Sequence, residues 1–187
     1  MTFPRTRLTA ASVLLASLVL VAPARADLPL RFVPEVAELT RGLICAPPPA
    51  GRREAPDTAF GWIHVPDEPI VIRREGTMVP AVLGMGFGVH FRLHDDAPRL
   101  LRYVVEHPPM EPQGVTRQSW EALTQGQGER VFFQFDLPEE LLPGFWSFTA
   151  LEGTQELFHA AFKVVSAEEA PGLSRLCEGD ELLALSR

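Results

Sequence analysis

Runs of alternating apolar and polar residues between positions 58 and 165 constrain the fold of this chain more than any other feature. Successive side chains of a β-strand point to opposite faces, so each run would place one apolar row on a single face of a sheet. Turn-forming residues such as Pro143-Gly144 and Glu152-Gly153 separate the runs. Short strands at this spacing predict a mainly β fold, an antiparallel β-sandwich or barrel. The apolar rows are Phe87, Val89, Phe91 and Leu93; Val131, Phe133, Phe135 and Leu137; Trp146, Phe148 and Ala150; and Phe158, Ala160, Phe162 and Val164.

The two flanks of this region have a different pattern. Residues 34–43 predict a short helix, because Pro34 suits a first helical turn and Val36, Leu39 and Leu43 recur at helical spacing. The proline-rich stretch 47–51 then reads as a stiff connector. The predicted division is a helical segment with its connector over 27–57, a sandwich over 58–165 and a helical tail over 166–187.

Residues 1–26 have the order of a cleavable secretory signal peptide. Arg5 and Arg7 precede an apolar run over 10–22, which is shorter than the ~20 residues that span a bilayer. Ala24-Arg25-Ala26 then supplies an A-x-A cleavage site. We therefore expect a periplasmic protein that begins at Asp27 and has no membrane span after cleavage.

Charge narrows the possible partners of the mature chain. The whole sequence has a formal net charge of −7, and removal of the three arginines in residues 1–26 makes it −10. A chain this acidic is repelled by nucleic acids and by anionic membrane surfaces. Neither is expected as a partner.

Cys45 and Cys177 are the two cysteines of the chain. In an exported protein, two thiols most simply form one disulfide, and this pair would tie together the segments that flank the sandwich. Two buried free thiols are the alternative. A zinc site is disfavoured because no C-x-x-C spacing is present.

Four short segments carry a resemblance to known proteins: Val79-Pro80-Ala81-Val82-Leu83-Gly84-Met85-Gly86-Phe87-Gly88-Val89, Glu106-His107-Pro108-Pro109, Leu142-Pro143-Gly144-Phe145-Trp146 and Ala161-Phe162-Lys163-Val164-Val165. Together they resemble a family of exported alphaproteobacterial proteins that carry a domain of unknown function. The resemblance spans most of the mature chain, including both cysteines, and implies an immunoglobulin-like β-sandwich without implying catalytic residues.

No catalytic or metal motif stands out in the sequence. The G-x-S-x-G nucleophile elbow is absent. His90 and His94 would lie about 13 Å apart on one strand face, too far to share a metal ion. We interpret His64 as an ordinary residue of a strand face, and the adjacent pair Glu139-Glu140 as solvated. The sequence therefore predicts no catalytic residue, no metal site and no cofactor.

Residues 108–129 form a long connection for a sandwich, and long loops in compact domains are often functional. Trp120 is the candidate binding residue of this segment, since tryptophan is enriched in interfaces. The alternative, which we favour, is that residues 115–120 form an extra strand and bury Trp120.

For function, we expect a monomeric, non-catalytic binding module of the bacterial cell envelope, whose partner is a protein or ligand that the sequence does not name. The alternative is a small periplasmic hydrolase with a site assembled from loops. An open cleft that groups a histidine with a serine or carboxylate would favour the enzyme, whereas an exposed aromatic patch or a bare sheet edge would favour the binder.

Overall fold

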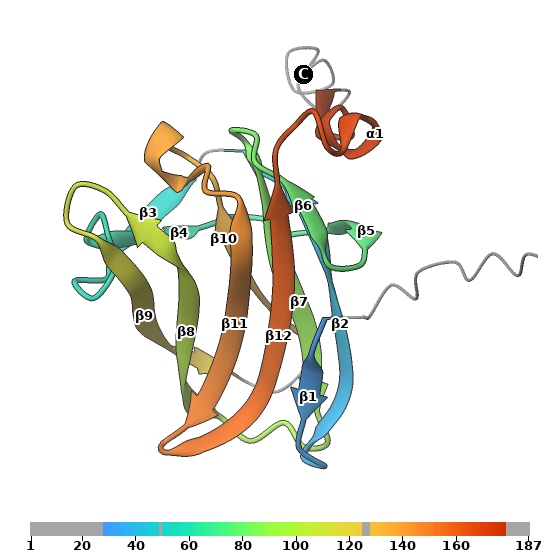
Figure 1. The fold of residues 1–187 in the computed structure, drawn as a ribbon. Helices are drawn as coiled ribbons and strands as arrows, with labels where there is room; N and C mark the ends of the chain where they lie inside the picture. The colour runs from blue at the N-terminus through green and yellow to red at the C-terminus, as the bar shows by residue number, and fades with distance from the viewer. Residues whose placement is uncertain (1–27, 49, 125–127, 179–187) are drawn as a thin grey trace, which may run out of the picture.

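A computed structural model describes residues 28–48, 50–124 and 128–178, and strands dominate these residues (Figure 1). The predicted mainly β, antiparallel fold is confirmed. The elements are β1 (Leu30–Phe32), β2 (Val36–Cys45), β3 (Gly51–Glu54), β4 (Trp62–Val65), β5 (Ile72–Glu75), β6 (Met78–Pro80), β7 (Met85–Leu93), β8 (Arg99–Met110), β9 (Val115–Thr124), β10 (Glu129–Gln134), the 3-10 helix η1 (Pro138–Glu140), β11 (Gly144–Glu152), β12 (Gln155–Val165) and α1 (Pro171–Ser174).

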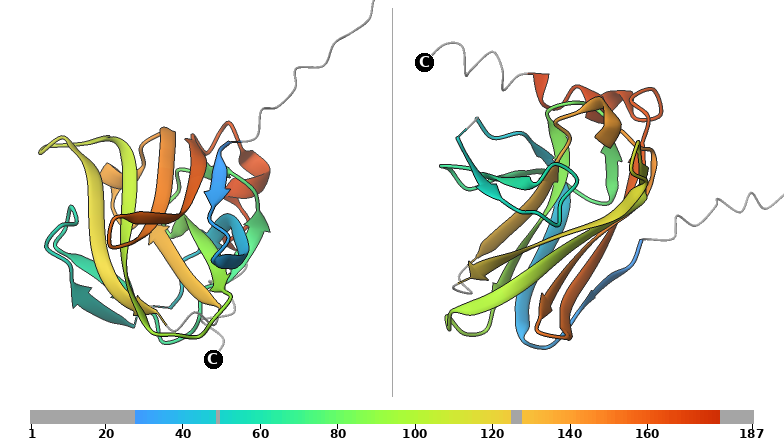
Figure 2. Two further views of the ribbon diagram at one scale, coloured as in Figure 1. Left: turned by 90° about the horizontal axis from the view of Figure 1, so that it is seen from below. Right: turned by 90° about the vertical axis from the view of Figure 1, so that its left-hand side faces the viewer.

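Two stacked sheets make up the sandwich (Figure 2). The larger sheet has the strand order β1-β12-β11-β8-β9, and β6 adds to β12 in parallel. The smaller sheet has the order β10-β7-β2-β5, with antiparallel neighbours throughout. Strands β9 and β10 each end their sheet, and they follow one another in the chain. A separate hairpin of β3 and β4 lies beside these two strands (Figure 1).

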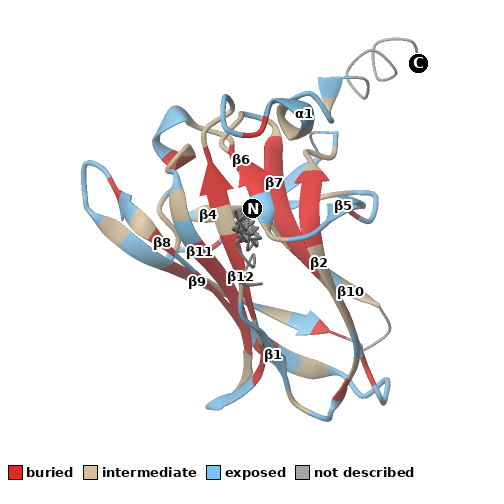
Figure 3. Cartoon of the chain, turned by 45° about the vertical axis from the view of Figure 1, so that its right-hand side comes forward, coloured by how far each residue is buried: buried red, intermediate tan, exposed pale blue. Residues whose placement is uncertain are grey.

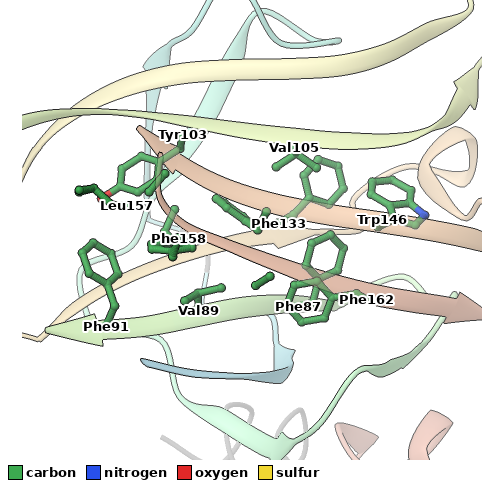
Figure 4. Packing of buried hydrophobic residues seen from close by; sticks show 14 of the residues in the cluster. Phe87, Val89, Phe91, Tyr103, Val105, Phe133, Trp146, Leu157, Phe158 and Phe162 are labelled. Atoms are coloured by element: carbon green, nitrogen blue, oxygen red, sulfur yellow. The ribbon is translucent and has the colours of Figure 1, made fainter. Parts of the chain in front are cut away.

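The core lies between the sheets and contains the predicted apolar rows. All members of these rows are buried except Leu137, which is half-buried. Phe87 is at the centre, with its ring 4.5 Å from that of Phe162 and 5.7 Å from that of Trp146 (Figure 4). Buried residues are concentrated in strands such as β2, β7 and β12, whereas the short strands β1 and β5 are mostly exposed (Figure 3). Period-two alternation thus identified the core correctly.

The helix predicted over residues 34–43 is wrong, because this segment forms strand β2. Its residues pair with β7 from Val36 to Cys45. A register shift between Val36 and Glu38 moves the next inward position to Leu39, and Arg41 occupies the inward position before Leu43. The apolar residues therefore recur at intervals of three and four residues along a strand, and pairing with β7 overrides the helical spacing.

The sandwich also extends beyond its predicted N-terminal limit at residue 58. Strand β1 pairs with β12 through Leu30, which lies opposite Ala160, and β2 is an inner strand of the smaller sheet. At the other end, the described part of the predicted helical tail contains the four-residue α1. Residues 179–187, like the predicted signal peptide at 1–26, lie outside them.

Cys45 and Cys177 form the predicted disulfide. Their Cα atoms are 5.6 Å apart, and the bond joins the end of β2 to the segment after α1. The C-terminal segment is thereby tied to an inner strand of the smaller sheet, and not to a helical flank as the sequence suggested. Within the described part of the chain, no helix has the length and apolar character needed to cross a membrane.

Candidate functional site

A cleft of about 670 Å³ opens where the edge strands of the two sheets face each other. Strand β9 lines one side and β10 lines the other, and the β3–β4 hairpin with residues 66–70 contributes further lining residues. The hairpin region is fixed to β9 by two hydrogen bonds: Ser119 N–H donates to the Asp57 carbonyl at 3.0 Å, and Arg53 Nη2 donates to the Glu121 carbonyl at 2.8 Å. The cleft is therefore built from segments far apart in sequence.

Aromatic and aliphatic side chains form the walls of the cleft. Trp120 of β9 packs against Tyr103 and Phe148, with ring centroids 6.0 and 5.7 Å apart. It is only half-buried, because the same side chain also lines the cleft. The favoured interpretation of residues 115–120 as an extra strand agrees with β9, while the role of Trp120 in binding stays a prediction. The apolar lining includes Trp62, Tyr103, Trp120, Ala122, Val131, Phe132 and Phe133.

A chain of hydrogen bonds connects the loop before β4 to the buried His107. The Ala59 N–H donates to Gln118 Oε1 at 2.8 Å, and Gln118 Nε2 lies 3.0 Å from His107 Nε2. His107 Nδ1 lies 2.8 Å from the Pro108 carbonyl, which can only accept, so Nδ1 carries the proton and Nε2 accepts from Gln118. This chain holds one wall of the cleft in place.

The polar end of the cleft is centred on Asp136. His64 Nε2 donates to Asp136 Oδ2 at 2.6 Å, and Gln134 Nε2 donates to Asp136 Oδ1 at 2.7 Å. The His64 ring also stacks on Phe132, with centroids 6.3 Å apart, and meets Trp62 edge-on at 4.9 Å. His64 thus joins the aromatic wall to the polar end.

Glu140 lies beside this group and is buried, although the sequence suggested a solvated pair with Glu139; only Glu139 is exposed. Its Oε2 accepts the backbone N–H groups of Asp136 and Leu137, at 2.6 and 2.9 Å. Burial raises the pKa of Glu140 to about 7, against the lowering effect of the two amide donors; the nearby Asp136 charge also raises it. Glu140 is therefore a buried carboxyl that titrates near neutral pH.

Sequence reasoning missed both His64 and Glu140. The contact between His64 and Asp136 spans 72 positions of sequence, so no local pattern indicates it. The role of Glu140 could have been predicted from the local sequence. Pro138 is the first residue of η1, and Glu140 follows Leu137 by three residues, which is the position from which a glutamate caps a helix start. That pattern predicts a carboxylate bound to the backbone instead of a solvated one.

The hydrogen-bond donors of the cleft are already directed at acceptors within the protein. His64 donates to a carboxylate, and the Thr58 hydroxyl, which also lines the cleft, donates toward the carbonyls of Ala55 and Trp62. No nucleophile–histidine pair is assembled at the cleft from residues that the structure describes. Over those same residues, no cluster of three or more histidine, cysteine or acidic side chains suits a metal ion. Cys45 and Cys177 are not among the lining residues.

Comparison with known proteins shows that the chain matches the model of one protein family. The model of a family described as a domain of unknown function, DUF3859, matches residues 33–164. Among solved structures, the chain is similar to an immunoglobulin-like protein from Pseudomonas aeruginosa, with 18% sequence identity and a TM-score of 0.47, over 75% of this chain and 99% of that one. No curated protein matches the chain.

Proposed function

We propose that this chain, which belongs to the DUF3859 family of unknown function, is a non-catalytic module of the bacterial cell envelope that binds a small ligand between β9 and β10. The cleft is the single observation that supports this proposal most directly. Its volume of about 670 Å³ lies within the range of small-molecule sites, and such sites combine apolar walls with a few placed polar groups. The signal-peptide pattern and the Cys45–Cys177 disulfide support an exported location.

Native mass spectrometry of protein purified from its host tests this proposal. The wild type should carry a bound small molecule. Ala122→Trp should lose it, because the added ring enters the cleft from β9. Leu100→Trp, on an exposed position of the neighbouring β8, is the matched control and should keep it. A bound mass that survives Ala122→Trp, or the absence of any bound mass from the wild type, would contradict the proposal.

A hydrolase is the second candidate, and the pairing of His64 with Asp136 beside Glu140 is the observation that favours it. Hydrolysis of p-nitrophenyl acetate separates the two. A binding module should give the same rate for the wild type and for His64→Gln. A rate that falls at least tenfold in His64→Gln, with the fold intact by circular dichroism, would make the cleft an active site.

A further inference from the structure

We infer that the ligand of the cleft is an organic cation with a flat apolar body, such as an aromatic amine, whose cationic end meets Glu140 and Gln134. This inference rests on the proposed function and adds the chemical class of the ligand. Three independent features of the cleft support it: the shape of its walls, the direction of its hydrogen-bond donors and the balance of its charges.

The walls suit a flat apolar body. Trp62 comes from the hairpin, Trp120 from β9 and Phe132 from β10, so aromatic rings line the cleft from three separate elements. Aromatic rings bind flat groups by stacking or edge contacts, and they attract cations through their faces. Trp62 already takes part in one such contact, since the Arg52 guanidinium carbon lies 3.7 Å from its ring centroid.

The polar end favours a ligand that donates hydrogen bonds. Its own donors are directed at carboxylates, from His64 and Gln134 to Asp136 and from two backbone amides to Glu140 Oε2. Gln134 Oε1 is buried and accepts no hydrogen bond from any described residue. A buried acceptor without a donor is costly, so an ammonium or guanidinium group that supplies one is favoured at this position.

The charge of the lining residues also favours a cationic ligand. Five acidic side chains line the cleft against two arginines, so negative charge predominates there. Clefts lined by one sign of charge concentrate ligands of the opposite sign. The charged lining residues are Asp67, Glu68, Glu129, Asp136 and Glu140 against Arg53 and Arg130, with His64 beside Asp136.

Three indole compounds that differ in charge test the inference: tryptamine, indole and indole-3-acetate, titrated calorimetrically at pH 8. The pKa of Glu140 is about 7, so at pH 8 its carboxyl is mostly ionised, while the primary amine of tryptamine stays protonated. Tryptamine should bind at least about tenfold more tightly than indole-3-acetate, the scale of one charge-assisted hydrogen bond.

Glu140→Gln should reduce this preference for tryptamine to less than about threefold. It keeps an oxygen for the two backbone amides, so the fold is expected to survive. Glu139→Gln removes the same charge from the exposed neighbour and should leave the preference unchanged. If Glu140→Gln fails to fold, Gln134→Met provides the second variant, which removes the unpartnered amide oxygen and should also weaken tryptamine binding.

The outcomes separate this inference from the proposed function. Equal binding of all three compounds, or tighter binding of indole-3-acetate, would overturn the cationic ligand while leaving the cleft a binding site, provided that Ala122→Trp abolishes the binding. No binding of tryptamine at millimolar concentration would also overturn it. The proposed function would then still be decided separately, by the bound mass in the native protein.

Discussion

His107 shows how one buried side chain supports the cleft from outside it. Its ring lies 4.7 Å from that of Trp146, and both of its nitrogens have partners. Burial lowers the pKa of His107, against the raising effect of the hydrogen bond to Pro108. A proton on Nε2 would face the donor group of Gln118, so the folded protein favours the neutral ring.

This arrangement predicts a dependence of stability on pH. The folded-state pKa of His107 lies below the unfolded value of about 6.5, so the unfolded chain binds more protons as pH falls. The contribution of His107 to stability is present above about pH 6.5 and is lost below it. The free energy of unfolding, measured by urea titration from pH 8 to 5, should fall less steeply in His107→Gln than in the wild type.

His94→Gln, at an exposed position, is the control for that series and should follow the wild-type curve. Glu140 acts in the opposite direction, because its folded-state pKa is raised to about 7 and its contribution is lost as pH rises toward that value. The pH dependence of the wild-type free energy of unfolding therefore contains both contributions. The contribution of His107 is obtained from the difference between the wild type and His107→Gln. Identical slopes for His107→Gln and the wild type would contradict the prediction.

Trp120 belongs both to the core and to the cleft, and two substitutions separate these roles. Trp120→Ala should lower the free energy of unfolding by about 2–3 kcal/mol, since it removes the contacts with Tyr103 and Phe148, and should also weaken tryptamine binding. Trp120→Phe should recover most of the stability. If Trp120→Ala unfolds more easily but binds tryptamine as well as the wild type does, Trp120 is a core residue only.

At the scale of elements, strand β2 connects the two sheets through one inward side chain. Arg41 lies on the core face of β2, opposite Val89 of β7. Its guanidinium donates to the carbonyls of Leu28, Pro29 and Ala161, at 2.7, 2.6 and 2.9 Å. The N-terminal segment and β12 of the larger sheet are thus bound to a strand of the smaller one.

Replacement of Arg41 should therefore loosen the N-terminal strand. Arg41→Met should cost about 1–3 kcal/mol, the scale of lost charge-assisted hydrogen bonds at a partly exposed site, and should raise the rate of amide hydrogen exchange in β1. Arg41→Lys should give an intermediate result, because an ammonium group lacks the planar fork of the guanidinium. Unchanged exchange in β1 would show that backbone pairing with β12 alone holds this strand.

Local patterns predicted those elements whose alternation is uninterrupted. Strands β7 and β10 follow the period of two along their lengths, β11 follows it up to the register shift after Ala150, and β12 follows it from Phe158 to Val164. These inward rows form the core. β2 was not predicted, because a register shift and an inward arginine disturb its alternation. The cleft was more difficult to predict from the sequence. Trp120 was identified as a candidate, but the cleft depends on a hairpin and two sheet edges that meet only in the folded chain.

At the scale of the whole molecule, one covalent bond closes most of the chain. The cysteines are 132 residues apart, and the loop that their disulfide closes contains nearly the whole sandwich. In the chain-entropy model, removal of such a bond by Cys45→Ser with Cys177→Ser should lower the free energy of unfolding by about 4–5 kcal/mol. Denaturant unfolding measures this loss, and equal midpoints for the variant and the oxidised wild type would contradict it.

We also predict that the whole protein is exported and cleaved. N-terminal sequencing of the protein isolated from its host should begin at Asp27, after cleavage at Ala24-Arg25-Ala26. Fractionation should recover the protein from the periplasm. An intact Met1 on protein found in the cytoplasm would refute both expectations and would also remove the oxidising environment that the disulfide needs.

The far edge of β12 has one more consequence, for contacts between copies of the protein. β1 covers this edge at residues 158–160, β6 covers it at 163–165, and between them the Arg41 side chain binds the Ala161 carbonyl. Both covering strands are only three residues long, and at the opposite end of the sheet β9 is bonded to the hairpin region. Short, interrupted edges are the means by which natural β-proteins discourage strand-by-strand aggregation. Among the described residues, the far edge of β12 therefore gives neighbouring copies no long backbone edge on which to add a strand.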